Sequence, residues 1–181
     1  MPSLRGRLLV AGPTLVDPSF DRTVVLLGEH GDEGAMGVVL NRPTEIAVAL
    51  AAEPLAALTD ADDVVWVGGP VQPQALVVLA DFVDTERAGL LALGSIGFLP
   101  AEIDDELSLG PLRACRVFAG YAGWGPGQLE QELADDAWIL ADPEPADVFT
   151  DDPDGLWSTV LRRRGGADAL LALLPRDPRV N

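Results

Sequence analysis

The amino-acid sequence predicts an α+β fold. Two observations support this. Two apolar runs rich in β-branched residues surround a glycine-containing link, and strand-like and helix-like segments then follow one another in mixed order. The chain has 181 residues, of which 48% are hydrophobic. A chain of this length is typical of one compact domain, here residues 1–181, and can bury roughly 70% of its unfolded surface.

The two apolar runs are predicted to pair as an antiparallel hairpin. Residues 23–29 read TVVLLGE and residues 35–41 read AMGVVLN, and both compositions favour buried strands. The link from His30 to Gly34 has five residues and two glycines, a usual length for a hairpin loop. A short apolar strand over residues 5–11 precedes the hairpin.

Further strands and helices are expected after the hairpin. Residues 46–58 favour a helix interrupted at Pro54, whereas residues 86–93 fit either a helix or a strand. Pro100 is expected to open a short helix that runs through Leu107. The other predicted strands are residues 64–67, 75–80, 113–121 and 137–141.

Three helices are predicted toward the C-terminus. The first runs from about Pro126 to Ala134. The second has Asp152 as its N-cap and Pro153 in its first position, and it ends at Arg164 before two glycines. A final helix is expected over residues 167–174. The apolar face of the second helix comprises Leu156, Trp157, Val160 and Leu161.

The charge of the chain excludes several classes of function. Twelve basic residues against 29 acidic residues give a net charge of −17, and every basic residue is an arginine. Without lysine, the chain can hold no Walker-A lysine, Schiff-base lysine or Ser–Lys dyad. Because affinity for nucleic acid comes largely from cations that neutralise phosphates, direct DNA binding is not expected. The one basic run, residues 162–164, fits the last turn of a helix or a contact with an anionic partner.

The numbers of cysteines and histidines and the hydropathy pattern restrict the possible metal sites, membrane segments and compartment. One histidine and one cysteine cannot form a usual structural zinc site, so we expect no metal and no cofactor. Cys115 lies in a predicted strand and is expected to be a small buried residue. No apolar run approaches the roughly 20 residues that span a bilayer. With no export segment and no disulfide framework, we expect a cytoplasmic protein.

Three segments together resemble the YqgE/AlgH family of small bacterial proteins. They are DPSFDRTVVLLGEHGDEGAMGVVLNRP (residues 17–43), GGPVQ (residues 68–72) and GYAGWGPGQLEQEL (residues 120–133). The resemblance implies an α+β fold with a bent, bifurcated, mainly antiparallel sheet that forms a pseudo-barrel with flanking helices. It carries over no catalytic residue. One family name reflects a proposed role in regulating alginate production, and the charge of this chain weighs against direct DNA binding as the means.

The third segment offers a candidate binding site. A strand feeds a glycine-rich turn and then a helix, so the backbone N–H groups after Gly125 could bind an anion. Gln128 and Glu130 would lie near this helix start, and Trp124 could form a wall of the site. The competing interpretation is structural: the glycines permit a tight turn, and Trp124 fills the core. Substitution Trp124→Ala would then cost on the order of 3 kcal/mol.

The ends of the hairpin offer a second group of candidates. His30 could act as a general base oriented by the carboxylates of Glu29 and Asp32, while Asn41 and Arg42 could bind an anionic group. The competing interpretation makes His30 an exposed loop residue and Arg42 an ion-pair partner of Glu29 or Glu45.

Two hypotheses on function therefore remain open. In the first, the protein is a non-enzymatic regulatory or interaction protein that acts through a protein partner or a small anionic ligand. In the second, it is a hydrolase or another enzyme on a small anionic substrate, with His30, Arg42 and the helix start after Gly125 forming one site. The second requires these groups to converge on one concave pocket.

The charge leads to a first testable prediction. The isolated protein should show no measurable binding to duplex DNA at about 150 mM salt. Its few basic side chains can neutralise few phosphates and so release few counterions from the DNA. A mobility-shift titration measures this directly. A submicromolar affinity at that salt concentration would show that the arginines gather on one face despite the net charge.

Overall fold

The computed structural model describes the chain except for residues 1, 16, 101–108 and 176–181. The helix expected from Pro100 to Leu107 therefore lies outside the described residues. The strands are β1 (Leu8–Ala11), β2 (Val24–Gly31), β3 (Gly34–Val39), β4 (Pro43–Ala47), β5 (Val64–Val67), β6 (Val71–Phe82), β7 (Leu90–Leu93), β8 (Ile96–Phe98), β9 (Leu112–Trp124) and β10 (Trp138–Ala141). The α-helices are α1 (Val48–Ala51), α2 (Gln128–Ala134), α3 (Pro145–Val148), α4 (Leu156–Arg164) and α5 (Gly166–Leu171). Short 3-10 helices are η1 (Pro18–Phe20), η2 (Glu53–Leu58) and η3 (Thr85–Arg87).

The strands form one large, branched sheet, and the predicted α+β class is confirmed. Its main path runs β10-β1-β2-β3-β9-β6-β8-β7, and β5 branches from β9 and pairs with β4. All pairs are antiparallel except β5 with β9, which is parallel. Within the described residues this path has two free ends. The bifurcation implied by the family resemblance is thus present, but the sheet is open and is not closed into a barrel.

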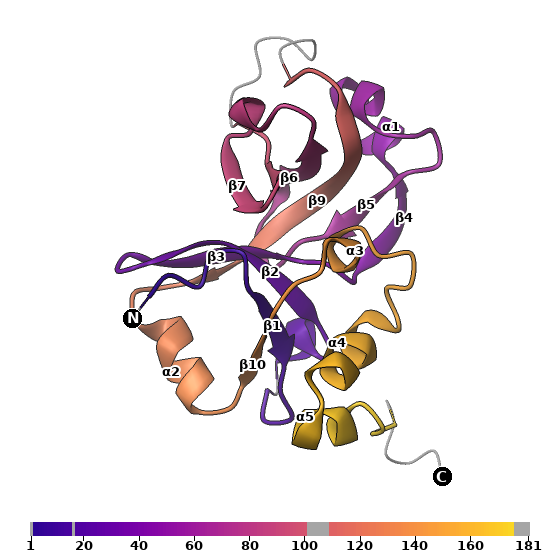
Figure 1. The fold of residues 1–181 in the computed structure, drawn as a ribbon. Coiled ribbons are helices and arrows are strands. Elements are labelled where there is room, and N and C mark those ends of the chain that lie inside the picture. The colour runs from indigo at the N-terminus through magenta and orange to yellow at the C-terminus, as the bar shows by residue number, and fades with distance from the viewer. Residues whose placement is uncertain (1, 16, 101–108, 176–181) are drawn as a thin grey trace.

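Strand β9 joins the two parts of the sheet. Its first part pairs with β6, from Phe82 opposite Leu112 to Leu76 opposite Ala119, and its last residues pair with β3. Trp66 and Val67 of β5 lie beside its middle section. In Figure 1, β9 runs from the upper part of the molecule, which holds β4 to β8, toward β1, β2 and β10 below. The strand predicted over residues 113–121 is therefore real but longer than expected.

Glycines allow the backbones to cross closely where β9 bends. Gly120 has φ 70°, and a Cβ placed on it would lie 2.5 Å from the carbonyl oxygen of Gly69. Gly68 and Gly69 belong to the GGPVQ segment, and the N–H of Gly68 donates to the carbonyl of Ala119 at 2.9 Å. A side chain at Gly120 would force these two segments apart. The crossing therefore requires glycine at this position.

The predicted hairpin is confirmed, with a tighter turn than expected. Strands β2 and β3 pair antiparallel from Val25 opposite Val39 to Gly31 opposite Gly34, which leaves two residues in the turn instead of five. Consequently, His30 lies in strand β2. The register shifts between Leu27 and Glu29, so Gly28 forms a bulge, and a Cβ there would meet the ring of Phe98.

Several predicted element boundaries are wrong. Residues 46 and 47 belong to β4, and the expected helix over 46–58 is α1 followed by the 3-10 helix η2. Helix α2 begins at Gln128 because Gly127, with φ 74°, occupies its N-cap position, so Pro126 lies in the preceding turn. Helix α4 begins at Leu156, and Asp152 instead accepts the N–H of Gly155 in the turn before it.

Helix α4 packs on the lower part of the sheet through its predicted apolar face. Leu156, Trp157, Val160 and Leu161 are all buried, and the indole N–H of Trp157 donates to the carbonyl of Ala11 in β1 at 2.9 Å. Arg163 ties α4 to α3, since its guanidinium binds both carboxylate oxygens of buried Asp147 at 3.0 and 2.6 Å. That hydrogen bond also raises the pKa of Arg163. Part of the basic run 162–164 therefore has a structural role.

The crossing at Gly120 can be tested by substitution. Gly120→Ala adds both a positive-φ penalty of roughly 1–2 kcal/mol and a steric clash, so its total cost should reach about 3 kcal/mol or more. Gly94→Ala is the matched control, because Gly94 also has positive φ (57°) but its added Cβ meets nothing within 4 Å. Chemical denaturation of both variants measures the difference. Equal losses of stability would mean that the close approach contributes nothing.

Candidate functional site

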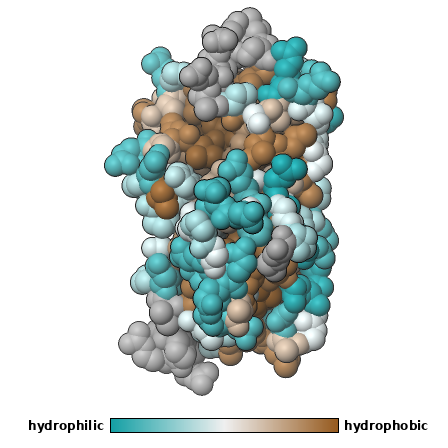
Figure 2. Space-filling view, turned by 90° about the vertical axis from the view of Figure 1, so that its left-hand side faces the viewer, coloured by the Kyte–Doolittle hydropathy of each residue, from teal (hydrophilic) through white to brown (hydrophobic). Residues whose placement is uncertain are grey.

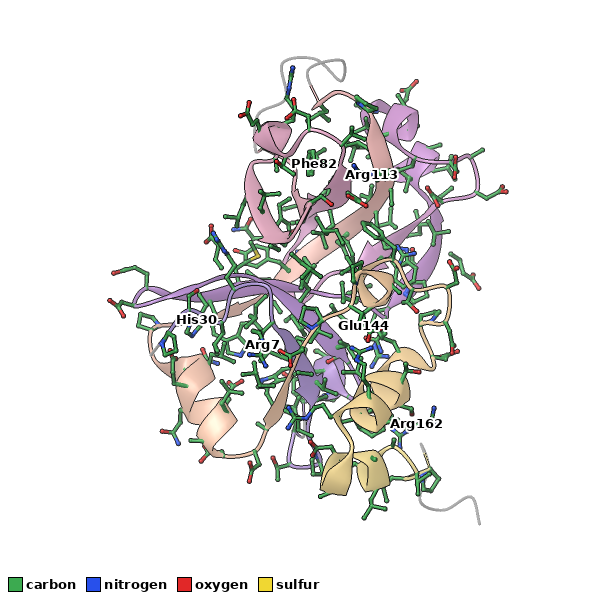
Figure 3. All side chains as sticks on the ribbon, in the orientation of Figure 1. Arg7, His30, Phe82, Arg113, Glu144 and Arg162 are labelled. Atoms are coloured by element: carbon green, nitrogen blue, oxygen red, sulfur yellow. The ribbon has the colours of Figure 1, made fainter. Side chains whose placement is uncertain are left out.

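His30 links three parts of the chain through its side chain and backbone. Its Nε2 lies 3.0 Å from Oε1 of Glu130 on α2, and its Nδ1 accepts the backbone N–H of Leu4 at 3.2 Å. The hydroxyl of Ser3 donates to its carbonyl oxygen at 3.1 Å. Figure 3 shows His30 between the β2–β3 hairpin and α2. Only 3% of the side chain is exposed, so the interpretation of His30 as an exposed loop residue is wrong.

These contacts fix the proton on the imidazole ring. Because Nδ1 accepts a backbone hydrogen bond, the neutral ring carries its proton on Nε2 and donates it to Glu130. Both ring nitrogens are therefore occupied by protein groups. Glu29 and Asp32, the residues expected to orient the ring, are exposed and lie on the adjacent surface. This geometry suits a residue that fastens the N-terminal segment and α2 to the hairpin.

The third resemblance segment forms a cluster around one carboxylate. Oε2 of Glu132 accepts the indole N–H groups of Trp124 and Trp138, each at 2.8 Å, and its Oε1 accepts the amide of Gln128 at 2.8 Å. Gln128 in turn accepts the backbone N–H of Gly125 at 3.0 Å. The rings of Trp124 and Trp138 meet edge-on at 5.8 Å, and Phe20 completes the group.

This cluster bears on the candidate anion site after Gly125. Trp124 is 7% exposed, as the structural interpretation predicted, and it ends strand β9 instead of lying in a loop. Gln128 and Glu132 use their polar atoms to hold the turn and both indoles. Glu132 was not among the predicted residues, although its spacing of four from Gln128 on a helix places the two on one face.

Asn41 and Arg42 lie at the opposite end of the hairpin from His30. Buried Asn41 accepts the N–H of Val24 at 3.0 Å and donates to the carbonyl of Arg22 at 2.9 Å, and Arg42 donates to the carbonyl of Asp21. Val24 and His30 are six positions apart along β2, a distance of roughly 20 Å at about 3.3 Å per residue. The structure therefore brings His30 together with Glu130, and Trp124 together with Gln128, but places Asn41 and Arg42 apart from His30.

Arg116, which the sequence analysis did not single out, lies between two aromatic rings. The guanidinium of Arg116 lies 4.0 Å from the ring centroid of Trp66 and 5.9 Å from that of Phe149, and it donates to the carbonyl of Thr150 at 3.2 Å. Burial lowers the pKa of Arg116. The neighbouring Cys115 is half-buried instead of fully buried, and desolvation raises the pKa of its thiol to about 12. The contacts of Arg116 hold β9 against its neighbours. The raised pKa of Cys115 means that its thiol does not form a reactive thiolate.

Two adjoining cavities form an open surface feature that we name the acidic–apolar trough. The acidic half, about 730 Å³, is lined by residues of the N-terminal segment, the hairpin and β7: Ser3, Arg5, Glu29, His30, Gly31, Asp32, Glu33, Gly34 and Leu90. The apolar half, about 540 Å³, is lined chiefly by Met36, Leu55, Leu76, Leu90, Phe98 and Leu99. Glu29 and Leu90 line both halves, so the two cavities adjoin each other at these residues. Figure 2 faces the side that bears β7 and the hairpin tip, and apolar side chains gather in its upper half.

In the described part of the chain, no three or more His, Cys, Asp and Glu side chains gather closely enough to hold a metal ion. None of the helices described is both long and apolar enough to cross a membrane.

The Glu132 cluster gives a prediction about stability. Glu132→Ala removes the acceptor of two buried indole N–H groups, each of which costs roughly 1–3 kcal/mol when unpaired, so the free energy of unfolding should fall by about 2–4 kcal/mol. Gln131→Ala, on the exposed face of the same helix, should change it by less than about 0.5 kcal/mol. Urea denaturation followed by tryptophan fluorescence reads both variants. A loss below about 1 kcal/mol for Glu132→Ala would contradict the structural role of this segment.

Comparisons with known proteins identify the same family that the three sequence segments resemble. A family model described as AlgH-like matches residues 8–169. A UPF0301 protein of Streptomyces coelicolor is 47% identical over 99% of this chain and 96% of its own length, and one of Mycobacteroides abscessus is 42% identical over 95% and 85%.

Solved structures are similar over nearly the whole chain. The crystal structure of protein DIP2367 from Corynebacterium diphtheriae has a TM-score of 0.84 at 27% identity, covering 96% of this chain and 93% of that one. The solution structure of the AlgH protein from Pseudomonas aeruginosa has a TM-score of 0.72 at 31% identity, covering 97% and 96%. Sequence and fold together show that this chain belongs to the AlgH-like, UPF0301 family.

Proposed function

We propose that this protein is a non-enzymatic interaction protein of the cytoplasm, which acts through a protein partner that docks on the acidic–apolar trough. One observation carries the proposal. Within the segments shared with the family, His30, Trp124, Glu130 and Glu132 use polar side-chain atoms in hydrogen bonds to one another. Glu29, Asp32 and Glu33 of the same hairpin are exposed instead, and they line the trough beside its apolar side chains. A surface of this kind suits recognition better than chemistry.

The burial and the hydrogen bonds of His30 also favour a binding role over a catalytic one. A general base must reach the proton that it abstracts, and the imidazole of His30 is almost fully enclosed, with each nitrogen in a hydrogen bond. The single cysteine is free, which fits a reducing compartment. The high pKa of its thiol supports a structural role for that residue as well.

Site-specific cross-linking tests the proposal. A photoreactive amino acid replaces Leu76, which is 39% exposed in the apolar half, in cells that make the protein naturally. We expect a covalent adduct with another protein. The matched control replaces Leu50, which is 86% exposed on α1 and lines neither half of the trough, and it should give no such adduct.

Two results would contradict the proposal. One is equal cross-linking from both positions. The other is the absence of a protein adduct at Leu76 combined with a small anionic molecule retained by the native protein in mass spectrometry. The latter result would favour the alternative, an enzyme or sensor for a small anionic substrate.

A further inference from the structure

We infer that the occupant of the trough is a short cationic and apolar segment of the partner protein, with its apolar side chains over β6, β7 and β8 and its basic side chains beside the hairpin tip. The inference rests on the proposed function, since it names the chemistry of the partner for the same surface. It is carried by the division of the trough into an apolar half and an acidic half that meet at Glu29 and Leu90.

The apolar half provides the area for docking. Leu76 on β6 is 39% exposed, and Met36, Leu90 and Leu99 around it are only partly buried. Among the residues that the structure describes, Glu29 is the one charged residue that lines this half. Covering these side chains contributes roughly 25 cal/mol of binding free energy for each Å² of apolar surface removed from water. The partner must therefore present apolar groups to them.

The acidic half sets the charge of the occupant. Glu29, Asp32 and Glu33 are exposed around the hairpin turn, and Arg5 is the single arginine among the lining residues. His30 is held by Glu130 and does not offset them. Three carboxylates against one guanidinium leave the rim net negative, so lysine or arginine side chains of a partner would be attracted to it.

The same charge argues against a second copy of this chain as the occupant. Each copy carries a net charge of −17, so two copies repel each other. Among the described residues, several arginines are already committed: Arg163 binds Asp147, Arg164 binds Asp168, Arg113 binds Asp81 and Arg116 lies against Trp66. These four arginines are therefore not available to the acidic trough of a second copy. A basic segment of another protein is the complementary partner.

Titration with defined peptides tests the inference. The probe is a fluorescently labelled eight-residue peptide of alternating leucine and arginine, and its counterpart carries glutamate in place of arginine. We expect the basic peptide to bind the full-length protein, more weakly at 300 mM than at 50 mM salt, and the acidic peptide not to bind. The double variant Glu29→Lys with Glu33→Lys should weaken binding by about tenfold or more, and Leu76→Ser should weaken it by a similar factor.

Matched variants separate specific docking from general attraction to an acidic protein. Asp60→Lys with Asp62→Lys makes the same change of charge in a loop that lines neither half of the trough, and Leu50→Ser removes a more exposed leucine elsewhere. Both should bind the basic peptide within about twofold of the wild type. Arg5→Glu should strengthen binding by at least about twofold, because it removes the lone cation of the acidic half. Thermal denaturation confirms that every variant is folded.

Three outcomes would overturn the inference. These are an equal loss of binding in the Asp60 and Asp62 control, weaker binding by Arg5→Glu, and binding of the acidic peptide as tight as that of the basic one. The proposed function fails separately. If the protein adduct formed at position 76 maps to a neutral or acidic segment of the partner, docking on the trough stands and only the inferred chemistry is wrong.

Discussion

The structure depends on one strand that serves two parts of a sheet. Strand β9 pairs with β6 and β5 along its first part and with β3 at its end, and it bends at Gly120. At that bend the backbone of β9 passes so close to the Gly68–Gly69 segment that side chains on both are excluded. The position of the hairpin relative to β6, β7 and β8, and therefore the shape of the trough between them, follows from this crossing.

The three segments that carry the family resemblance meet around this crossing. The hairpin and Phe20 come from the first, Gly68 and Gly69 from the second, and Gly120 and Trp124 from the third. Their glycines permit close backbone contact, and their polar side chains pair with one another, as in the bond from His30 to Glu130. A shared sequence pattern in this region thus reflects the demands of the fold. Glu29 of the first segment and Leu76 of β6 are exposed beside this region.

Local pattern predicted much of the fold, and contacts between distant residues account for most of what it missed. Alternation and composition placed the hairpin, β5 and the buried face of α4 correctly, since these depend on neighbours in the sequence. The hairpin turn was too long by three residues, because the bulge at Gly28 and its contact with Phe98 carry no local pattern. Helix starts at Pro126 and Asp152 were placed early because turns held by Gln128 and Asp152 precede the helices.

In the candidate site, the sequence predicted the setting of single residues but not the contacts between them. Sequence spacing indicated that Trp124 would be buried, but it could not show that Glu132 binds the indoles of both Trp124 and Trp138. The trough was invisible to sequence reasoning because Met36, Leu76 and Leu90 come from three separate strands.

Native-state hydrogen exchange tests the central role of β9 most directly. If β9 joins the two parts of the sheet into one cooperative unit, amides of β2 and β3 should exchange with the same free energy of opening as those of β6 and β8. Gly120→Ala should lower both values together. A β6–β8 region that exchanges at a distinctly lower free energy, or a Gly120→Ala effect confined to one part, would show that the two parts unfold independently and would contradict this account.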